Sequence, residues 1–109
     1  MIPLINEFQA QLAELCRRYG VQRLDLFGSA AKGTFMPESS DLDFIVRFQD
    51  PGSPDYATRY LRFAESLEAL FKRPVDLLID QPFSNPYFRE AVEEARQTVY
   101  ESRDEKAVV

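Results

Sequence analysis

Histidine is absent from the 109-residue sequence, and cysteine occurs once, at Cys16. The lack of histidine excludes Ser-His-Asp and Cys-His catalytic sites and histidine-ligated zinc. A single cysteine excludes an internal disulfide framework and is typical of a reducing cytosol, so we expect a cytoplasmic protein. Acid, base or metal chemistry must therefore depend mainly on carboxylates, lysine, tyrosine or the one thiol.

Long apolar runs and an excess of positive charge are also missing. No apolar run approaches the roughly 18 residues of a membrane span. The N-terminus has an early Glu7 and no basic segment, so we expect no secretory signal. Thirteen basic against 18 acidic residues give a net charge of −5, which argues against binding extended nucleic acid through its phosphates. A magnesium–nucleotide site is compatible with this charge, because the metal supplies positive charge locally.

The length and composition predict one globular domain over residues 1–109, with a polar tail from about residue 102. Hydrophobic residues make up 45% of the chain and charged residues 28%, which is ordinary for a folded domain with one core.

Hydrophobic periodicity predicts the elements of the first half of the chain. Apolar residues at helical spacing favour a helix over 3–19 that ends at Gly20. Strict alternation favours strands over 21–27 and 41–48. The segment between these strands, residues 28–40, is rich in Gly, Ser and Pro and reads as a loop with one short helical turn at 29–32.

The second half is predicted to hold two helices around one strand. Ser53 is expected to cap a helix that has Pro54 at its first position and continues through residue 71. A strand follows over 75–80. A last helix is expected to open at Asn85 and Pro86 and to carry Phe88, Val92, Ala95 and Val99.

The predicted fold is therefore a small α/β domain of the α+β type, with three strands and three helices. Each strand has one apolar and one polar face, so helices are expected to cover one face of the sheet. The other face carries Asp41, Asp43 and Asp76 if neighbouring strands align them.

These three aspartates are the candidate catalytic and metal-binding residues. Asp41 and Asp43 are two positions apart on a strand, so they point the same way. Clustered carboxylates are unfavourable unless a cation lies between them. Mg²⁺ prefers oxygen ligands and is commonly held by one or two carboxylates plus substrate phosphates. Two such ions can activate an attacking oxygen and stabilise a leaving one.

Gly28 and Ser29 are candidate nucleotide-binding residues. Glycine after a strand lets the backbone approach a ligand, and amides at the start of a helical turn suit a triphosphate. Lys32 adds a positive charge about one turn later. The stretch is not a P-loop, because Thr34 stands where that motif has lysine.

Each feature also has an ordinary interpretation. Asp-x-Asp alone is most often a solvated strand face, and Gly-Ser alone is usually a turn, whereas their order together with a third aspartate on another strand is more specific. Cys16 is interpreted as a packed thiol, and Asp80 is expected near its strand end, beyond the site. The following basic residues are interpreted as solvated helix faces: Arg17, Arg18, Arg59, Arg62, Lys72 and Arg73.

The segments LFGSAAKGTFMPESSDLDFIV, RPVDLL and NPYFREAVEEARQTVYE together resemble the minimal nucleotidyltransferases of the DNA polymerase β superfamily, often called MNT-domain proteins. The resemblance runs from about residue 21 to 101. It implies a compact mixed sheet flanked by helices. It also implies that Gly28 and Ser29 hold the β- and γ-phosphates of ATP, that Asp41 and Asp43 bind Mg²⁺, and that Asp76 is the third carboxylate.

Many members of this family are antitoxins of HEPN ribonuclease toxins. The resemblance thus implies transfer of AMP from ATP to a tyrosine of a partner toxin in a hetero-oligomer. This sequence departs from the family in two places. The loop before Asp41 is one residue longer than the commonest spacing, and Lys32 replaces an arginine, which keeps the charge but loses the bidentate fork.

Three alternatives to this function remain open from the sequence. The protein could neutralise its partner by contact alone, with a vestigial or regulatory nucleotide site. It could modify a small molecule, although relatives that do so usually carry a second domain for the acceptor. It could also have no nucleotide site, which would leave the clustered carboxylates unexplained.

Overall fold

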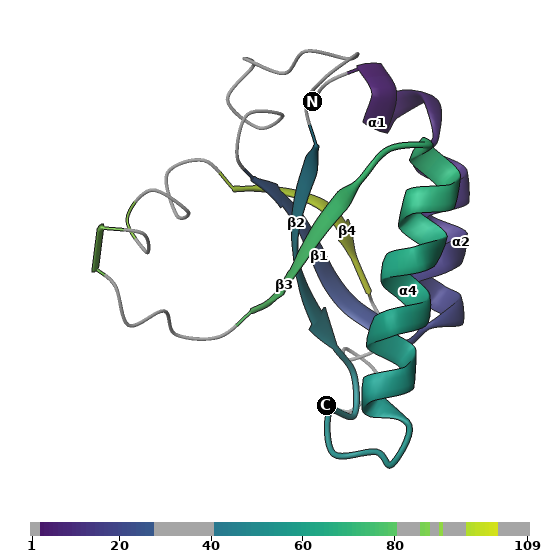
Figure 1. Ribbon diagram of the computed structural model, residues 1–109, viewed down its shortest axis with the longest axis vertical. Helices are drawn as coiled ribbons and strands as arrows, with labels where there is room; N and C mark the ends of the chain where they lie inside the picture. The colour runs from purple at the N-terminus through teal and green to yellow at the C-terminus, as the bar shows by residue number, and fades with distance from the viewer. Residues whose placement is uncertain (1–2, 28–40, 81–85, 88–89, 91–95, 103–109) are drawn as a thin grey trace.

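The computed structural model (Figure 1) describes residues 3–27, 41–80, 86–87, 90 and 96–102. Two short helices, α1 (Pro3–Glu7) and α2 (Gln9–Arg18), come first. Strands β1 (Val21–Phe27) and β2 (Leu42–Phe48), helix α4 (Tyr56–Phe71) and strands β3 (Val75–Ile79) and β4 (Gln97–Glu101) follow. Of the predicted elements, the loop at 28–40 and residues Phe88, Val92 and Ala95 of the last helix lie outside the described residues.

The four strands form one mixed sheet in the order β3-β2-β1-β4. β1 pairs antiparallel with both β2 and β4, whereas β2 and β3 are parallel and are joined through α4. A parallel pair requires such a crossover, because a tight turn can join only antiparallel strands. Figure 1 shows α2 and α4 side by side against one face of this sheet, as the alternation of the strands predicts.

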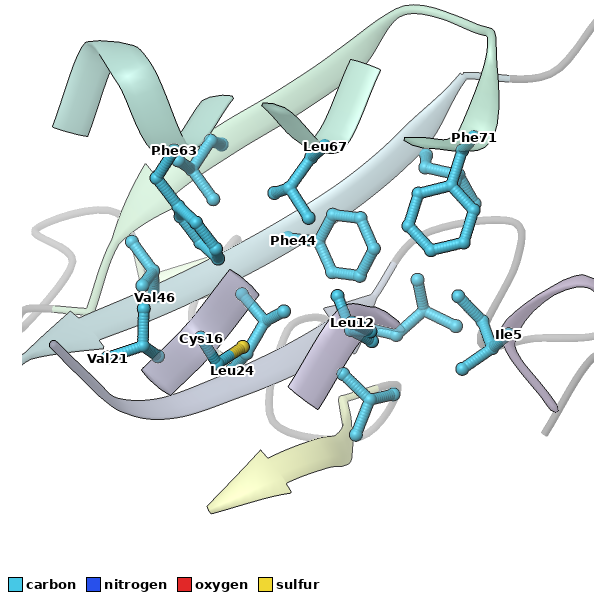
Figure 2. Close-up of a cluster of buried hydrophobic side chains, with 14 of the residues drawn as sticks. Ile5, Leu12, Cys16, Val21, Leu24, Phe44, Val46, Phe63, Leu67 and Phe71 are labelled. Carbon is cyan, nitrogen blue, oxygen red and sulfur yellow. The ribbon is translucent and has the colours of Figure 1, made fainter. Parts of the chain in front are cut away.

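The core lies between the sheet and these two helices. Figure 2 shows Phe63, Leu67 and Phe71 of α4 meeting Phe44 of β2 and Leu12 of α2. Phe44, Phe63 and Leu67 are completely buried. Cys16 is also completely buried, which confirms that it is a packed thiol, and burial raises its pKa to about 12. Within the described residues, no helix is long and apolar enough to cross a membrane.

The end of the chain corrects one prediction. Val99, expected on the last helix, lies instead in β4, where it is buried in the core. The segment QTVYE is rich in β-branched and aromatic residues, which favour strands. It pairs with the edge of β1 that β2 leaves open, so the described sheet has four strands and not three.

Smaller corrections concern helix boundaries. The predicted helix over 3–19 is interrupted at Phe8, whose ring packs edge-on against Phe71 with 5.8 Å between ring centroids. α4 begins at Tyr56 and not at Pro54, because the Ser53 hydroxyl donates to Asp55 Oδ1 at 2.7 Å instead of capping the helix. The expected stop after the first helices is confirmed, since Gly20 has a left-handed φ of 68°.

Arg59 is not the solvated side chain that the sequence indicates. Its guanidinium lies 5.3 Å from the ring centroid of Phe48 and 5.7 Å from that of Tyr56. The same group donates to the backbone oxygens of Tyr19 at 3.2 Å and Asp50 at 2.8 Å. Arg59 therefore ties the start of α4 to the ends of α2 and β2.

Candidate active site

Asp43 and Asp76 lie opposite each other on the parallel strands β2 and β3. Their neighbours Phe44 and Leu77 form the next pair in the register and are buried in the core. Because side chains alternate along a strand, Asp43 and Asp76 point to the sheet face that α2 and α4 do not cover. The expected alignment of these two aspartates on the open face is therefore confirmed.

Asp41 comes directly before β2 and is exposed, not part of the predicted strand. Asp43 is half-buried between its neighbours. Burial raises the pKa of Asp43, and the negative charges of Asp76 and then Asp41 raise it further. Asp76 and Asp41 thus both lie within electrostatic reach of Asp43. A cation bound among them would remove this repulsion.

The aspartate side chains of the site have the oxygen atoms that Mg²⁺ prefers, but the three carboxylates do not surround a single point. Mg²⁺ takes carboxylate oxygens and completes its shell with water and substrate phosphates, so two aspartates on adjacent strands are an adequate protein contribution. Among the residues described, no group of three or more carboxylate or thiol side chains is close enough to hold a metal ion.

The candidate phosphate-binding residues Gly28, Ser29 and Lys32 lie outside the described residues. The strand that precedes them in the sequence is described. β1 ends at Phe27, which is the pairing partner of Asp43. Phe27 precedes Gly28 in the sequence, so the described end of β1 that leads to the Gly-Ser segment lies beside Asp43.

An ion-pair network that the sequence did not reveal covers another part of the open face. Asp25 of β1 is completely buried, and each of its carboxylate oxygens has an arginine partner. Arg23 Nε lies 3.0 Å from Oδ1, and Arg96 Nε lies 2.6 Å from Oδ2. Arg96 continues to Asp80 at 3.3 Å, and Asp80 also accepts from Arg47 at 3.0 Å.

This network lies next to the carboxylate pair along the sheet. Asp25 is opposite Ile45, two residues from Asp43 on the same face of β2. Asp80, predicted as the last residue of its strand, directly follows β3 and, beyond the site as expected, belongs to this network rather than to the Asp43–Asp76 pair. The alternation of β1 placed Arg23 and Asp25 on the polar face, but nothing in the sequence marked Arg96 as their partner.

A hollow in the described part of the chain lies elsewhere, between α2 and α4. Leu15 of α2 and Leu70 of α4 are among its lining residues. It belongs to the helical layer, whereas Asp43 and Asp76 point away from that layer. We therefore place the candidate active site at the carboxylate pair and not at this hollow.

Known proteins similar to this chain are nucleotidyltransferases, which agrees with the paired carboxylates of the site. A family model described as "Nucleotidyltransferase domain" matches residues 9–99. The protein adenylyltransferase MntA of Thermococcus cleftensis is 36% identical over 70 residues, which cover 64% of this chain and 67% of the relative. A Methanocaldococcus jannaschii protein, provisionally named a protein adenylyltransferase, is 34% identical over 80 residues, covering 73% of this chain and 78% of the relative.

Solved structures share the fold. One, provisionally described as a minimal nucleotidyltransferase, superposes with a TM-score of 0.68 at 28% identity, covering 88% of this chain and 95% of that one. A toxin–antitoxin structure with AMP-PNP superposes with a TM-score of 0.62 at 21% identity, covering 92% of this chain and 78% of that one. The open sheet face with its paired aspartates and the match over residues 9–99 together show that this chain belongs to the nucleotidyltransferase domain family.

Proposed function

We propose that this nucleotidyltransferase transfers AMP from ATP to a hydroxyl of a partner protein. The proposed acceptor is a tyrosine of a HEPN-type toxin, so that the protein acts as the antitoxin of the pair. The observation that carries the proposal is the alignment of Asp43 with Asp76 on the open face, next to the end of β1 at Phe27. The name of the Thermococcus relative and the toxin–antitoxin structure support the choice of acceptor.

In this proposal Asp41, Asp43 and Asp76 hold Mg²⁺, with two ions expected. When bound, the ions neutralise the phosphate charge and polarise the reacting oxygens. Gly28 and Ser29 hold the β- and γ-phosphates through backbone amides and the serine hydroxyl, and Lys32 adds a positive charge.

The reaction itself is an in-line displacement at the α-phosphorus of ATP. The acceptor oxygen forms a bond to this phosphorus while the bond to pyrophosphate breaks. Asp76 helps to remove the proton of the attacking hydroxyl. The domain supplies the nucleotide site and the carboxylates, and the partner supplies the acceptor and closes the exposed face against water.

The proposal is tested by incubating the protein with Mg²⁺, a native lysate and ATP labelled at either the α- or the γ-phosphate. We expect a protein band labelled from α-labelled ATP alone, and no band with Asp43→Asn. Asp50→Asn is the matched control, because it makes the same change at an exposed turn residue whose left-handed φ of 51° asparagine tolerates.

A band labelled from γ-labelled ATP would indicate a kinase and contradict the proposal. Equal labelling by Asp43→Asn and the wild type would also contradict it. If no band is labelled while a partner still co-purifies, the result favours the alternative in which the protein neutralises that partner by contact alone.

A further inference from the structure

Strand β3 forms one edge of the described sheet, so half of its backbone groups face away from β2. Pro74 O accepts from Leu42 N at 3.2 Å, and Asp80 N donates to Val46 O at 2.8 Å. In a parallel strand the N–H and C=O of one residue point the same way and alternate along the chain. Val75 and Leu77, at the odd positions, therefore present their backbone groups to the outer edge.

Helix α4 binds the outer edge of β3 at these two residues. Glu68 Oε2 accepts from the Val75 amide at 3.1 Å. The Tyr60 hydroxyl donates to the Leu77 carbonyl oxygen. The two helix residues are eight positions apart, so they lie two turns apart on one side of α4. Side chains of the helix thus take the place of a further strand.

The two bonded residues are the immediate neighbours of Asp76. With the register to β2 on one side and the two α4 contacts on the other, the backbone around Asp76 is held from both edges. A shift of one residue would turn the Asp76 side chain to the core face. The two contacts therefore act on the very position that sets Asp76 opposite Asp43.

The surroundings of Tyr60 keep it able to donate. Burial raises the pKa of its hydroxyl, and the negative charge of Asp76 raises it further. The hydroxyl thus stays protonated over the pH range in which enzymes of this kind work. Tyr56, one turn earlier on α4, packs edge-on against the ring of Phe48 and lies near the guanidinium of Arg59.

We propose that Tyr60 and Glu68 are positioning residues that hold Asp76 in place for metal binding. This inference rests on the proposed function, because it takes Asp76 as a metal ligand. Neither side chain touches substrate; both act through the backbone of β3. Residues that orient metal ligands commonly change metal affinity by about 10- to 100-fold when they are removed.

The test compares Tyr60→Phe with Tyr56→Phe, the same change one helical turn away. Mn²⁺ binding is followed by electron paramagnetic resonance without nucleotide, and the Mg²⁺ concentration for half-maximal transfer is measured separately. We expect Tyr60→Phe to weaken Mn²⁺ binding about tenfold and to raise the Mg²⁺ requirement, with Tyr56→Phe close to the wild type. Urea unfolding of both variants reports whether each folds.

A second pair of variants covers the case in which Tyr60→Phe does not fold. Glu68→Ala should weaken Mn²⁺ binding, whereas Glu68→Gln, which keeps an oxygen acceptor for the Val75 amide, should restore most of the affinity. Wild-type metal affinity in Tyr60→Phe and in Glu68→Ala would overturn the inference while leaving the proposed function intact. A wild-type protein that binds no Mn²⁺ and labels no acceptor would overturn both.

Discussion

Removal of the Arg96 guanidinium is expected to be the most damaging single change on the open face. The Asp25 side chain is completely buried, and Arg96 Nε lies 2.6 Å from its Oδ2. In Arg96→Met the side chain keeps much of its length and apolar surface but loses its charge and donors. Oδ2 then loses this partner, while Arg23 still binds Oδ1 at 3.0 Å.

The expected cost follows from the burial of the remaining charge. Breaking a buried ion pair by removing one partner typically costs about 3–5 kcal/mol, because a buried charge is left uncompensated. Since Arg23 still pairs with Oδ1 of Asp25, we expect the lower end, about 3 kcal/mol. A domain of this kind is stable by about 5–15 kcal/mol in total, so the loss is a large share of it.

The assay is urea unfolding followed by circular dichroism, with the slope of the transition compared between variants. Arg47→Met is the matched control. The Arg47 side chain is 52% exposed in its pair with Asp80, so its loss should cost at most about 1 kcal/mol. Adding Asp25→Leu to Arg96→Met removes the buried negative charge of Asp25 and should recover part of the lost stability. Equal unfolding free energies for Arg96→Met and Arg47→Met would refute this reasoning.

Three further predictions concern Asp43, the thiol of Cys16 and the contacts of Arg59. Folding favours the protonated form of Asp43, so its contribution to stability is lost as pH rises through its raised pKa. Asp43→Asn should thus stabilise the metal-free protein at neutral pH by about 0.2–1 kcal/mol, with less gain in acid; a lower melting temperature at neutral pH would contradict this. Cys16 should resist iodoacetamide in the folded protein and react only in urea, because its thiol is buried and weakly acidic; rapid labelling of the native protein argues against such packing. Arg59→Lys should cost about 1–2 kcal/mol in urea unfolding by losing the ring contacts and the fork to two carbonyls. The exposed control Arg62→Lys should leave the free energy of unfolding unchanged. An equal loss of stability in both variants would contradict a stabilising role for the Arg59 contacts.

Local alternation was enough to predict the part of the fold that carries the site. β1 was predicted over 21–27 and is observed there, and β2 begins one residue later than predicted. Period-two patterning also predicts which face each side chain takes, so Asp43 and Asp76 were expected on one face. Their pairing depended on the register between β2 and β3, which the structure supplies.

The features that the sequence did not reveal depend on contacts between distant parts of the chain. Val99 continues a helical spacing of apolar residues, yet it joins a strand because the edge of β1 is available to it. Arg96 and Asp25 are 71 positions apart, and no local pattern links them. The environment of Arg59 likewise depends on distant residues, since its partners come from the ends of two other elements, α2 and β2.

The measurement that tests the proposed function most directly is the intact mass of the purified partner protein after incubation with this enzyme, ATP and Mg²⁺. We expect the partner to gain one or more AMP units, the added mass to map to a hydroxyl side chain, and Asp43→Asn to add none. A partner of unchanged mass that is nevertheless bound and silenced by the wild type and by Asp43→Asn alike would contradict the proposed function.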